Sequence, residues 1–246
     1  MGSVTRLKRS QVKRHVTFTY IDVDGNYQEC DVSQAGDVEF EKAQPVRTFT
    51  YSPTQKHTPG KLWSTTCGRH LDYESYLESR WLLVYDRDPA IVGISTQPFR
   101  IECLDPLGSW RHTPDVFLRH ADGTGTVVDV KPEQFVDEDV LEQSERTREV
   151  CAEVGWTYLH VSEPDPQYMA NIEWLSAYRR CAPDIDLRDR ILHLAQRPVT
   201  VGELVAATDQ PDSTSSIGHM LWTGELDTDL QKRITIGTYV RNGRTQ

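Results

Sequence analysis

Two short apolar runs joined by a glycine-containing turn constrain the fold of this chain most strongly. They lie in the segment RHTPDVFLRHADGTGTVVDVKPEQF, which predicts strands at about 112–119 and 126–131. Strand interiors disfavour charged side chains. Asp115 nevertheless stands at the start of the first run, and Asp129 and Lys131 interrupt the second. We therefore expect an interaction partner of opposite charge to stabilise these charged side chains in the sheet.

The spacing of the two runs predicts that two carboxylates share one face of the sheet. Side chains alternate along a strand, so Val127, Asp129 and Lys131 point the same way. If the connection is 120–124, Asp115 lies opposite Asp129 on that face. Paired carboxylates repel each other, and burying them is costly unless a cation lies between them. Because Lys131 stands two residues further along, the pattern favours a divalent metal ion.

The expected metal is Mg²⁺ or Mn²⁺. Mg²⁺ takes few carboxylates and keeps water molecules for the phosphates of a substrate. The candidate ligands are the carboxylates of Glu78, Asp115 and Asp129 and the backbone carbonyl of Val130. Bound metal would polarise a phosphodiester and lower the pKa of its water. Lys131 would orient that water or offset charge on the phosphorane.

The helix that carries Glu78 is predicted from its capping pattern. Asp72 is expected to cap the helix, which should run to about Tyr85 before the sequence DRDP ends it. Glu78 stands beside Leu77 and Trp81, so its carboxylate is expected to border an apolar stripe.

The order of the remaining elements predicts a mixed α/β protein. A hairpin is expected in HVTFTYIDVDGNYQECDV, and a mostly irregular segment at 41–69. AIVGISTQPFRIECL and WTYLHVS read as strands, with the QP step marking an edge or a bulge. DEDVLEQSERTREVCAEVG and NIEWLSAYRRC read as helices. This mixture of helices and strands is typical of α/β folds.

The chain changes character after Pro183. Three short helical patterns and a terminal strand follow within about 60 residues, which suggests a winged helix-turn-helix. The expected recognition helix, around 213–222, contains no Lys or Arg. Helices that read DNA normally carry such residues, so we expect this module to dock a protein.

Charge is distributed unevenly along the chain. The net charge of -10 by itself speaks against nucleic-acid binding. Three tracts nevertheless carry Lys and Arg without any acid, namely 1–21, 42–71 and the tail after Asp229. Phosphate binding depends on local charge rather than on the total. The tracts together favour a nuclease, and solvated surface is the alternative for each of them.

Cysteine usage and hydropathy indicate a cytoplasmic protein. The chain of 246 residues suffices for one large domain or for a medium domain with a small appendage. Its five scattered cysteines form no C-x-x-C pair, which favours a reducing compartment and argues against a zinc site. No apolar run approaches the roughly 20 residues of a membrane span. The first fifteen residues lack the apolar centre of a signal peptide.

Four segments resemble the TnsA-like heteromeric transposase endonuclease subunits. They are DYESYLESRWLLVYDRDPAIVGISTQPFRI, HTPDVFLRHADGTGTVVDVKP, GWTYLHVSE and NIEWLSAYRR. Together they carry an E-x-x-x-E helix, a Q-P strand, T-P-D and D-V-K-P in the order and at the spacing of that family. The resemblance covers about residues 60–182, and the C-terminal region is similar in style.

The resemblance implies a restriction-endonuclease-like fold, in which helices flank a mixed sheet. This catalytic core would occupy 67–182. A basic arm, a β-hairpin and an irregular segment would occupy 1–66, and the winged-helix-like module 186–246.

The function implied by the resemblance is that of a bacterial metal-dependent DNA endonuclease in cut-and-paste transposition. It would nick the 5′ strand of double-stranded DNA at each transposon end, while an integrase-like transposase subunit cuts the 3′ strand. An AAA+ ATPase regulator would join through the C-terminal module. Carried over position by position, the catalytic acids fall on Glu78 and Asp115, and the catalytic lysine on Lys131. The best-known member has Gln where this chain has Asp129, although Asp is the usual choice in restriction nucleases.

Two other functions stay open on the sequence alone. A stand-alone restriction or repair endonuclease would use the same site but would not need the C-terminal module. A non-catalytic adaptor of a mobile element would only dock on DNA ends, and the intact set of Glu78, Asp115, Asp129 and Lys131 argues against it. His112 and His160 flank strands and are expected to be packing or solvent-facing residues rather than ligands. No Gly-rich phosphate loop is present, so ATP hydrolysis would belong to a partner.

Overall fold

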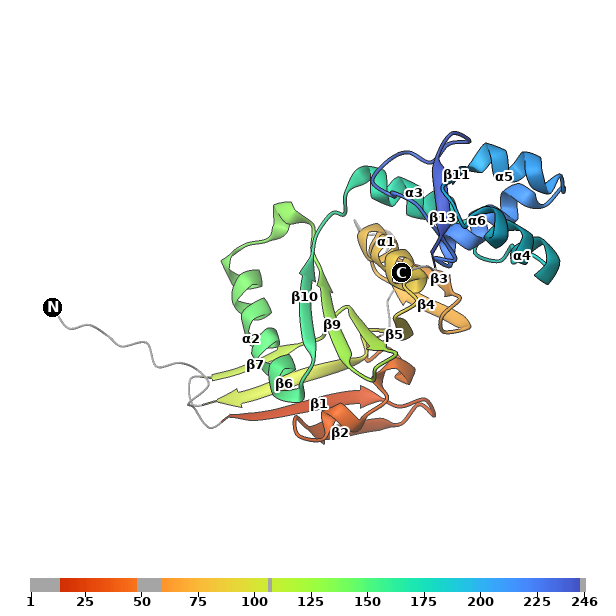
Figure 1. Ribbon diagram of the computed structural model, residues 1–246. Helices are drawn as coiled ribbons and strands as arrows, with labels where there is room; N and C mark the ends of the chain where they lie inside the picture. Colours follow the sequence, from red (N-terminus) through yellow and green to blue (C-terminus); the bar gives the residue numbers. More distant parts are fainter. Residues whose placement is uncertain (1–13, 48–58, 106–107, 244–246) are drawn as a thin grey trace. The chain divides into compact units, whose positions relative to one another are not determined.

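The computed structural model describes residues 14–47, 59–105 and 108–243. They form two compact units, which are coloured along the sequence in Figure 1. The first unit takes its residues from Met1–Gln55 and Gly93–Val161, and the second from Lys56–Val92 and Ser162–Gln246. Each unit is thus assembled from two separate stretches of the chain.

The first unit contains an antiparallel sheet in the order β2-β1-β6-β7. Its strands are β1 (His15–Ile21), β2 (Tyr27–Asp31), β6 (Phe99–Asp105) and β7 (Gly108–His112). The apolar residues Val16 and Phe18 alternate with polar ones along β1, and both are buried. Between β1 and β2 the chain turns at Gly25, whose φ of 87° is accessible to glycine at little cost. The alternation therefore commits one face of this sheet to the core.

A second sheet has the order β10-β9-β8-β5. Its strands are β5 (Ile91–Thr96), β8 (Val116–His120), β9 (Gly125–Val130) and β10 (Thr157–Val161). Strands β8 and β9 pair antiparallel, whereas β9 and β10 pair parallel and therefore need a crossover connection. Helix α2 (Glu138–Val154) makes that crossover and packs along β10 (Figure 1). Asp137 caps its start, and Gly155 ends it with a φ of 85°.

Aromatic side chains fill the core of the first unit. The ring centroids of Phe40 and Phe99 lie 4.7 Å apart, and those of Phe117 and Trp156 lie 5.0 Å apart. Both pairs are oriented edge-on. Phe18 from β1 joins the same cluster. Within the described residues, short 3-10 helices lie in the connections, namely η2 (Ala35–Asp37), η3 (Phe40–Lys42) and η4 (Glu133–Phe135). The cluster thus ties the first sheet to β8 and to the residue before β10.

The second unit combines a hairpin, helices and a small sheet. The hairpin consists of β3 (Gly60–Ser64) and β4 (Arg69–Tyr73). The helices are α1 (Tyr76–Arg87), α3 (Pro166–Ser176), α4 (Ile185–Leu194), α5 (Val201–Thr208) and α6 (Ser213–Trp222). The sheet has the order β11-β13-β12, with β11 (Val199–Thr200), β12 (Leu226–Asp227) and β13 (Tyr239–Asn242). All five helices contribute side chains to one buried core, namely Leu83, Ile172, Ile191, Leu204 and Leu221.

The mixed α/β character predicted from the sequence is confirmed. The described residues contain six α-helices and several sheets. Among those residues, no helix combines the length and the apolarity needed to span a membrane.

The prediction of an irregular segment at 41–69 is wrong in its last part. Residues 60–64 pair with β4 as a regular strand. The buried carboxylate of Asp86 in α1 holds the turn of this hairpin, because it accepts hydrogen bonds from the side chain of Ser64 and the backbones of Thr65 and Thr66. This stabilisation comes from a residue about twenty positions away, so a local pattern could not reveal it. Residues 48–58 lie outside the described part of the chain.

The predicted cap of α1 is also wrong. Ser75 is the N-cap, and its Oγ accepts a hydrogen bond from the backbone N–H of Glu78. Asp72 lies in β4 instead, where it forms an ion pair of 3.1 Å with Lys61. Pairing with β3 keeps the chain extended as far as Tyr73, and the helix therefore begins later than predicted.

Candidate functional site

Asp115, just before β8, and Asp129, in the neighbouring strand β9, lie at the same level of the sheet. The β8–β9 register pairs Val116 with Val128, and one further step brings Asp115 across from Asp129. The connection closes where the N–H of His120 donates to the carbonyl of Thr124 at 2.9 Å. The predicted five-residue connection 120–124 is thus present, and with it the predicted level of the two carboxylates.

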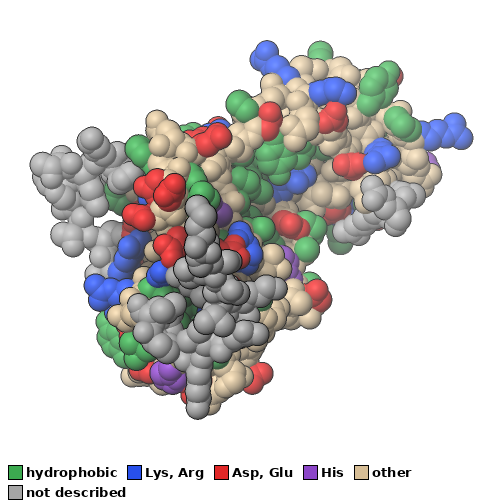
Figure 2. All heavy atoms as spheres, turned by 90° about the vertical axis from the view of Figure 1, so that its left-hand side faces the viewer, with side chains coloured by type: hydrophobic (Ala, Val, Ile, Leu, Met, Phe, Trp, Pro, Cys, Tyr) green, Lys and Arg blue, Asp and Glu red, His purple; other side chains and the backbone are tan. Residues whose placement is uncertain are grey.

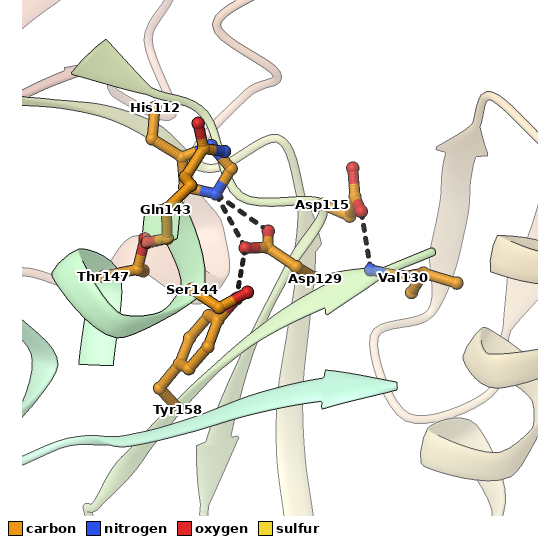
Figure 3. A network of polar contacts seen from close by, with 8 residues as sticks. All are labelled: His112, Asp115, Asp129, Val130, Gln143, Ser144, Thr147 and Tyr158. Atoms are coloured by element: carbon orange, nitrogen blue, oxygen red, sulfur yellow. Dashed lines mark hydrogen bonds and ion pairs between the residues drawn. The ribbon is translucent and has the colours of Figure 1, made fainter. Parts of the chain in front are cut away.

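Backbone hydrogen bonds fix Asp115 just before β8. Its carboxylate Oδ2 accepts from the N–H of Val130 at 2.8 Å (Figure 3). Its carbonyl accepts from the N–H of Gln97 at 2.9 Å. Asp115 thereby bridges the end of β9 and the chain between β5 and β6.

The carboxylate of Asp129 lies in a polar network of its own. Nε2 of His112 is 2.9 Å from Oδ1 and 2.8 Å from Oδ2, and the hydroxyl of Tyr158 donates to Oδ2 at 2.7 Å. Nε2 of Gln143 in turn lies 2.5 Å from Nδ1 of His112. Figure 3 shows the carboxylate of Asp129 directed toward His112 and Tyr158, while that of Asp115 lies on the side of Val130. The two carboxylates therefore have separate partners.

Burial and the charge of Asp129 act together on the groups around it. Burial, followed by the negative charge of Asp129, raises the pKa of the Tyr158 hydroxyl. The same two causes raise the pKa of the Cys151 thiol to about 12. Both groups therefore stay protonated at neutral pH, and Tyr158 keeps a proton to donate to the carboxylate.

Val130 and Lys131 lie at the end of β9. The N–H of Val130 is engaged by Asp115, and the N–H of Lys131 donates to the carbonyl of Val161 at 2.9 Å. The residue Lys131 is exposed. Its backbone is thus held by the sheet, while its exposed side chain follows the end of β9, the strand that contains Asp129.

Glu78 belongs to the second unit, and the other three predicted catalytic residues belong to the first. It is buried at the start of α1. Its Oε1 accepts from the hydroxyl of Ser75 at 2.9 Å, and its Oε2 accepts from the N–H of Glu74 at 2.8 Å. Within its own unit, Glu78 thus stabilises the first turn of α1.

Among the described residues, no three His, Cys, Asp or Glu side chains gather in a group that could hold a metal ion. The candidate donors that lie in the first unit are the carboxylates of Asp115 and Asp129. Two carboxylates suit Mg²⁺, which is commonly held by one or two of them and completes its shell with water and substrate. The chemistry of this pair of carboxylates fits Mg²⁺. All four predicted ligands, Glu78, Asp115, Asp129 and Val130, stay predictions.

Sequence reasoning missed the residues that hold Asp129. His112 was expected to be a packing or solvent-facing residue, but it is mostly buried and bonded to the carboxylate. Tyr158 could have been found from strand pairing, since β10 pairs Tyr158 with Val127 and His160 with Asp129. Gln143 carried no signal, because it is one polar residue among many on the sequence of α2.

The acid-free basic tracts are largely neutralised where they are described. Five of their eight described lysines and arginines form ion pairs with carboxylates from outside each tract or from its edge, namely Arg14–Glu149, Lys42–Glu39, Lys61–Asp72, Lys232–Asp229 and Arg241–Asp227. Figure 2 likewise shows acidic and basic side chains interspersed on the face that it presents. The remaining basic residues of the first tract, together with Lys56 and Arg244, lie outside the described residues. The described part of the tracts thus gives little support for a phosphate-binding surface.

Comparison with known proteins identifies the segment that carries the two aspartates. Residues 88–163 match the family model described as TnsA-like endonuclease N terminal. The match confirms the resemblance for the segment that includes Asp115, Asp129 and Lys131, whereas Glu78 and the C-terminal helices lie outside it. No curated protein matches the chain.

Proposed function

We propose that this TnsA-like endonuclease is the subunit of a heteromeric transposase that hydrolyses the 5′-strand phosphodiester at transposon ends. Its substrate is double-stranded DNA, and its metal is Mg²⁺ or Mn²⁺. An integrase-like transposase subunit cuts the other strand, and an AAA+ ATPase regulator joins the complex.

One observation carries the proposal. Inside the segment that matches the endonuclease family, Asp115 and Asp129 stand at the same level of two adjacent strands, and Lys131 follows at the end of β9. Two acids can hold the metal that polarises a phosphodiester, and a neighbouring lysine can offset the charge that develops on it. This combination favours an active nuclease over an adaptor that only holds DNA ends.

Asp115 and Asp129 would hold the metal, with Glu78 and the carbonyl of Val130 as further ligands. When bound, Mg²⁺ polarises the phosphodiester and lowers the pKa of coordinated water. The residues of the chain orient the reactants. Lys131, whose backbone is fixed by Val161, presents its ammonium group to the attacking water or to the developing charge on phosphorus.

The C-terminal helices support a protein-docking role. Helices α4, α5 and α6 with the sheet β11-β13-β12 have the content of a winged helix. Seven of the ten residues of α6 are buried. A Cβ atom at Gly218 would lie 2.6 Å from the ring of Tyr178, so this face of α6 packs closely within its own unit. A helix buried in this way is poorly suited to enter a DNA groove, which favours the ATPase regulator as the partner of the module.

A strand-specific nicking assay tests the proposal. Transposon-end duplex labelled on both strands would be incubated with Mg²⁺, this protein, the transposase subunit and the ATPase. We expect a nick in the 5′ strand that Asp115→Ala abolishes, while cutting of the 3′ strand by the partner persists. The same substitution should abolish Mn²⁺ binding in a calorimetric titration.

The alternatives give different results in this assay. A stand-alone nuclease would cut duplex DNA without the partner subunits. An adaptor would leave the 5′ strand intact under all conditions, and that result would overturn the proposed activity.

A further inference from the structure

We propose that His112, itself held by Gln143, is a positioning residue that orients the Asp129 carboxylate for metal binding. The inference rests on the proposed function in one respect, namely that Asp129 is a metal ligand. It adds two residues, His112 and Gln143, that the motif of acids and lysine does not contain.

The hydrogen-bond pattern defines the tautomer of His112. A carboxylate only accepts hydrogen bonds, so Nε2, which lies 2.8 Å and 2.9 Å from the two oxygens of Asp129, carries the proton. Nδ1 can then accept from the side-chain amide of Gln143, whose Nε2 lies 2.5 Å away. Gln143 therefore selects the form of His112 that donates to Asp129. Hydrogen bonds of this kind to a ligating carboxylate commonly hold it in the orientation that a metal requires.

Counting acceptor sites indicates that the network orients Asp129 without occupying it fully. A carboxylate offers about four lone-pair sites. Oδ2 accepts from both His112 and Tyr158, whereas within the described residues Oδ1 has His112 as its sole partner. One site on Oδ1 thus stays available for a cation. The position of that oxygen is set by groups from β7, α2 and β10.

The network stands beside an apolar core, where polar side chains are costly. Asp129 and His112 have side chains that are only 14% and 11% exposed, and Tyr158 belongs to the aromatic core cluster of the first unit. The hydroxyl of Tyr158 also lies 3.1 Å from Oγ of Ser144 on α2. Apolar residues at these positions would extend the core, so a built polar network here indicates a selected role for the carboxylate.

The test compares variants of His112 in the full-length protein. Mn²⁺ affinity would be measured by calorimetry and by the electron paramagnetic resonance of free Mn²⁺, together with thermal unfolding in the absence of metal. We expect His112→Ala to weaken Mn²⁺ binding by about 10- to 100-fold, the size seen when a partner of a metal ligand is removed. His112→Gln keeps an N–H donor near the place of Nε2 and should restore the affinity to within about threefold of wild type.

His120 provides a matched control. His120 ends β8, so it lies at the end of the β8–β9 pair that is remote from Asp115 and Asp129. Its Nε2 is 2.8 Å from Oγ1 of Thr126. His120→Ala should leave Mn²⁺ affinity unchanged. If His112→Ala does not fold, Gln143→Leu and Tyr158→Phe take its place, and each is expected to weaken Mn²⁺ binding by about 10-fold.

The possible outcomes separate this inference from the proposed function. Wild-type protein that binds no Mn²⁺ and nicks no DNA would overturn the proposed function, and the positioning role with it. Wild-type binding combined with an equal affinity in folded His112→Ala would overturn the positioning role alone. A His112→Gln variant as weak as His112→Ala would also count against it, because the N–H donor would then not be what matters.

Discussion

Each unit contains a mostly buried aspartate, and the two aspartates are held in different ways. Asp86 in the second unit accepts four hydrogen bonds, two on each oxygen, from Ser64, Thr65 and Thr66. Asp129 in the first unit accepts from an imidazole and a phenol and keeps a site on Oδ1 without a partner among the described residues.

The difference separates structural from functional carboxylates. All acceptor sites of Asp86 are filled by the hydroxyls and backbone amides of a single turn, so a ligand has nothing left to bind. The partners of Asp129 come from separate elements and fix its direction without filling it. Saturation of a buried carboxylate thus indicates a fold-stabilising role, and incomplete saturation indicates a site. Four predictions test this distinction.

The largest expected effect is the loss of 5′-strand nicking on substitution of Lys131. Lys131→Ala should reduce 5′-strand nicking by a factor on the order of 10²–10³, the size expected for the loss of one preorganised charged donor. Stability and Mn²⁺ affinity should not change, because the residue is exposed. The measurement is the two-strand nicking assay with both subunits present, combined with thermal unfolding.

Lys42 is the control for charge removal. It is an exposed lysine that is paired with Glu39 at 2.7 Å, and Lys42→Ala should nick at the wild-type rate. Full 5′ nicking by Lys131→Ala would show that Lys131, which follows β9, is not catalytic.

Asp86→Asn should have the largest effect on stability. The new amide group would face two donors on one side of the side chain, and two charge-assisted hydrogen bonds would be lost. We expect the free energy of unfolding to fall by about 3 kcal/mol, measured by urea denaturation. Asp88 accepts a single bond, from the N–H of Ala90 at 2.9 Å. Asp88→Asn, close by in sequence, keeps an oxygen that can accept this bond and should cost much less. Equal losses in the two variants would refute the special role of saturation.

The sequence predicted the part of the site that depends on local rules. Alternation and the length of one turn were sufficient to bring Asp115 level with Asp129. Sequence reasoning failed where the partners come from far along the chain. The turn that begins at Ser64 is stabilised by a hydrogen bond to Asp86, and His112 is held by Gln143, thirty-one positions later in the sequence. Side-chain hydrogen bonds between distant elements have no periodicity, so only the folded structure reveals them.

A matched pair of serine substitutions gives a smaller effect. Ser64→Ala removes a donor at 2.6 Å from Asp86 and the acceptor for the N–H of Cys67, and it should cost about 2 kcal/mol of unfolding free energy. Ser144→Ala leaves the hydrogen bond between Tyr158 and Asp129 intact, and should cost less than about 1 kcal/mol. Urea denaturation of both variants measures the difference. A larger loss for Ser144→Ala would reverse the assignment of the two carboxylates.

The smallest predicted effect is a gain in stability at Gln97. This residue follows β5 with a φ of 42°, and its backbone N–H donates to the carbonyl of Asp115. Its side chain is fully buried, and neither Nε2 nor Oε1 has a hydrogen-bond partner among the described residues. An unpaired buried amide loses its hydration without compensation. Gln97→Met keeps a similar volume and removes that loss, so the free energy of unfolding should rise by about 1 kcal/mol.

Asn171 provides the opposite case for this last prediction. It is also buried, but its Nδ2 donates to the carbonyls of Leu230 and Lys232, each at 2.8 Å. Asn171→Leu should therefore destabilise the protein, because two backbone carbonyls would lose their donor. If urea denaturation shows that Gln97→Met raises the free energy of unfolding and Asn171→Leu lowers it, the distinction between filled and unfilled hydrogen-bonding sites extends from carboxylates to amides. A loss of stability in Gln97→Met would mean that this amide has a partner in solution, such as a bound water molecule beside Asp115.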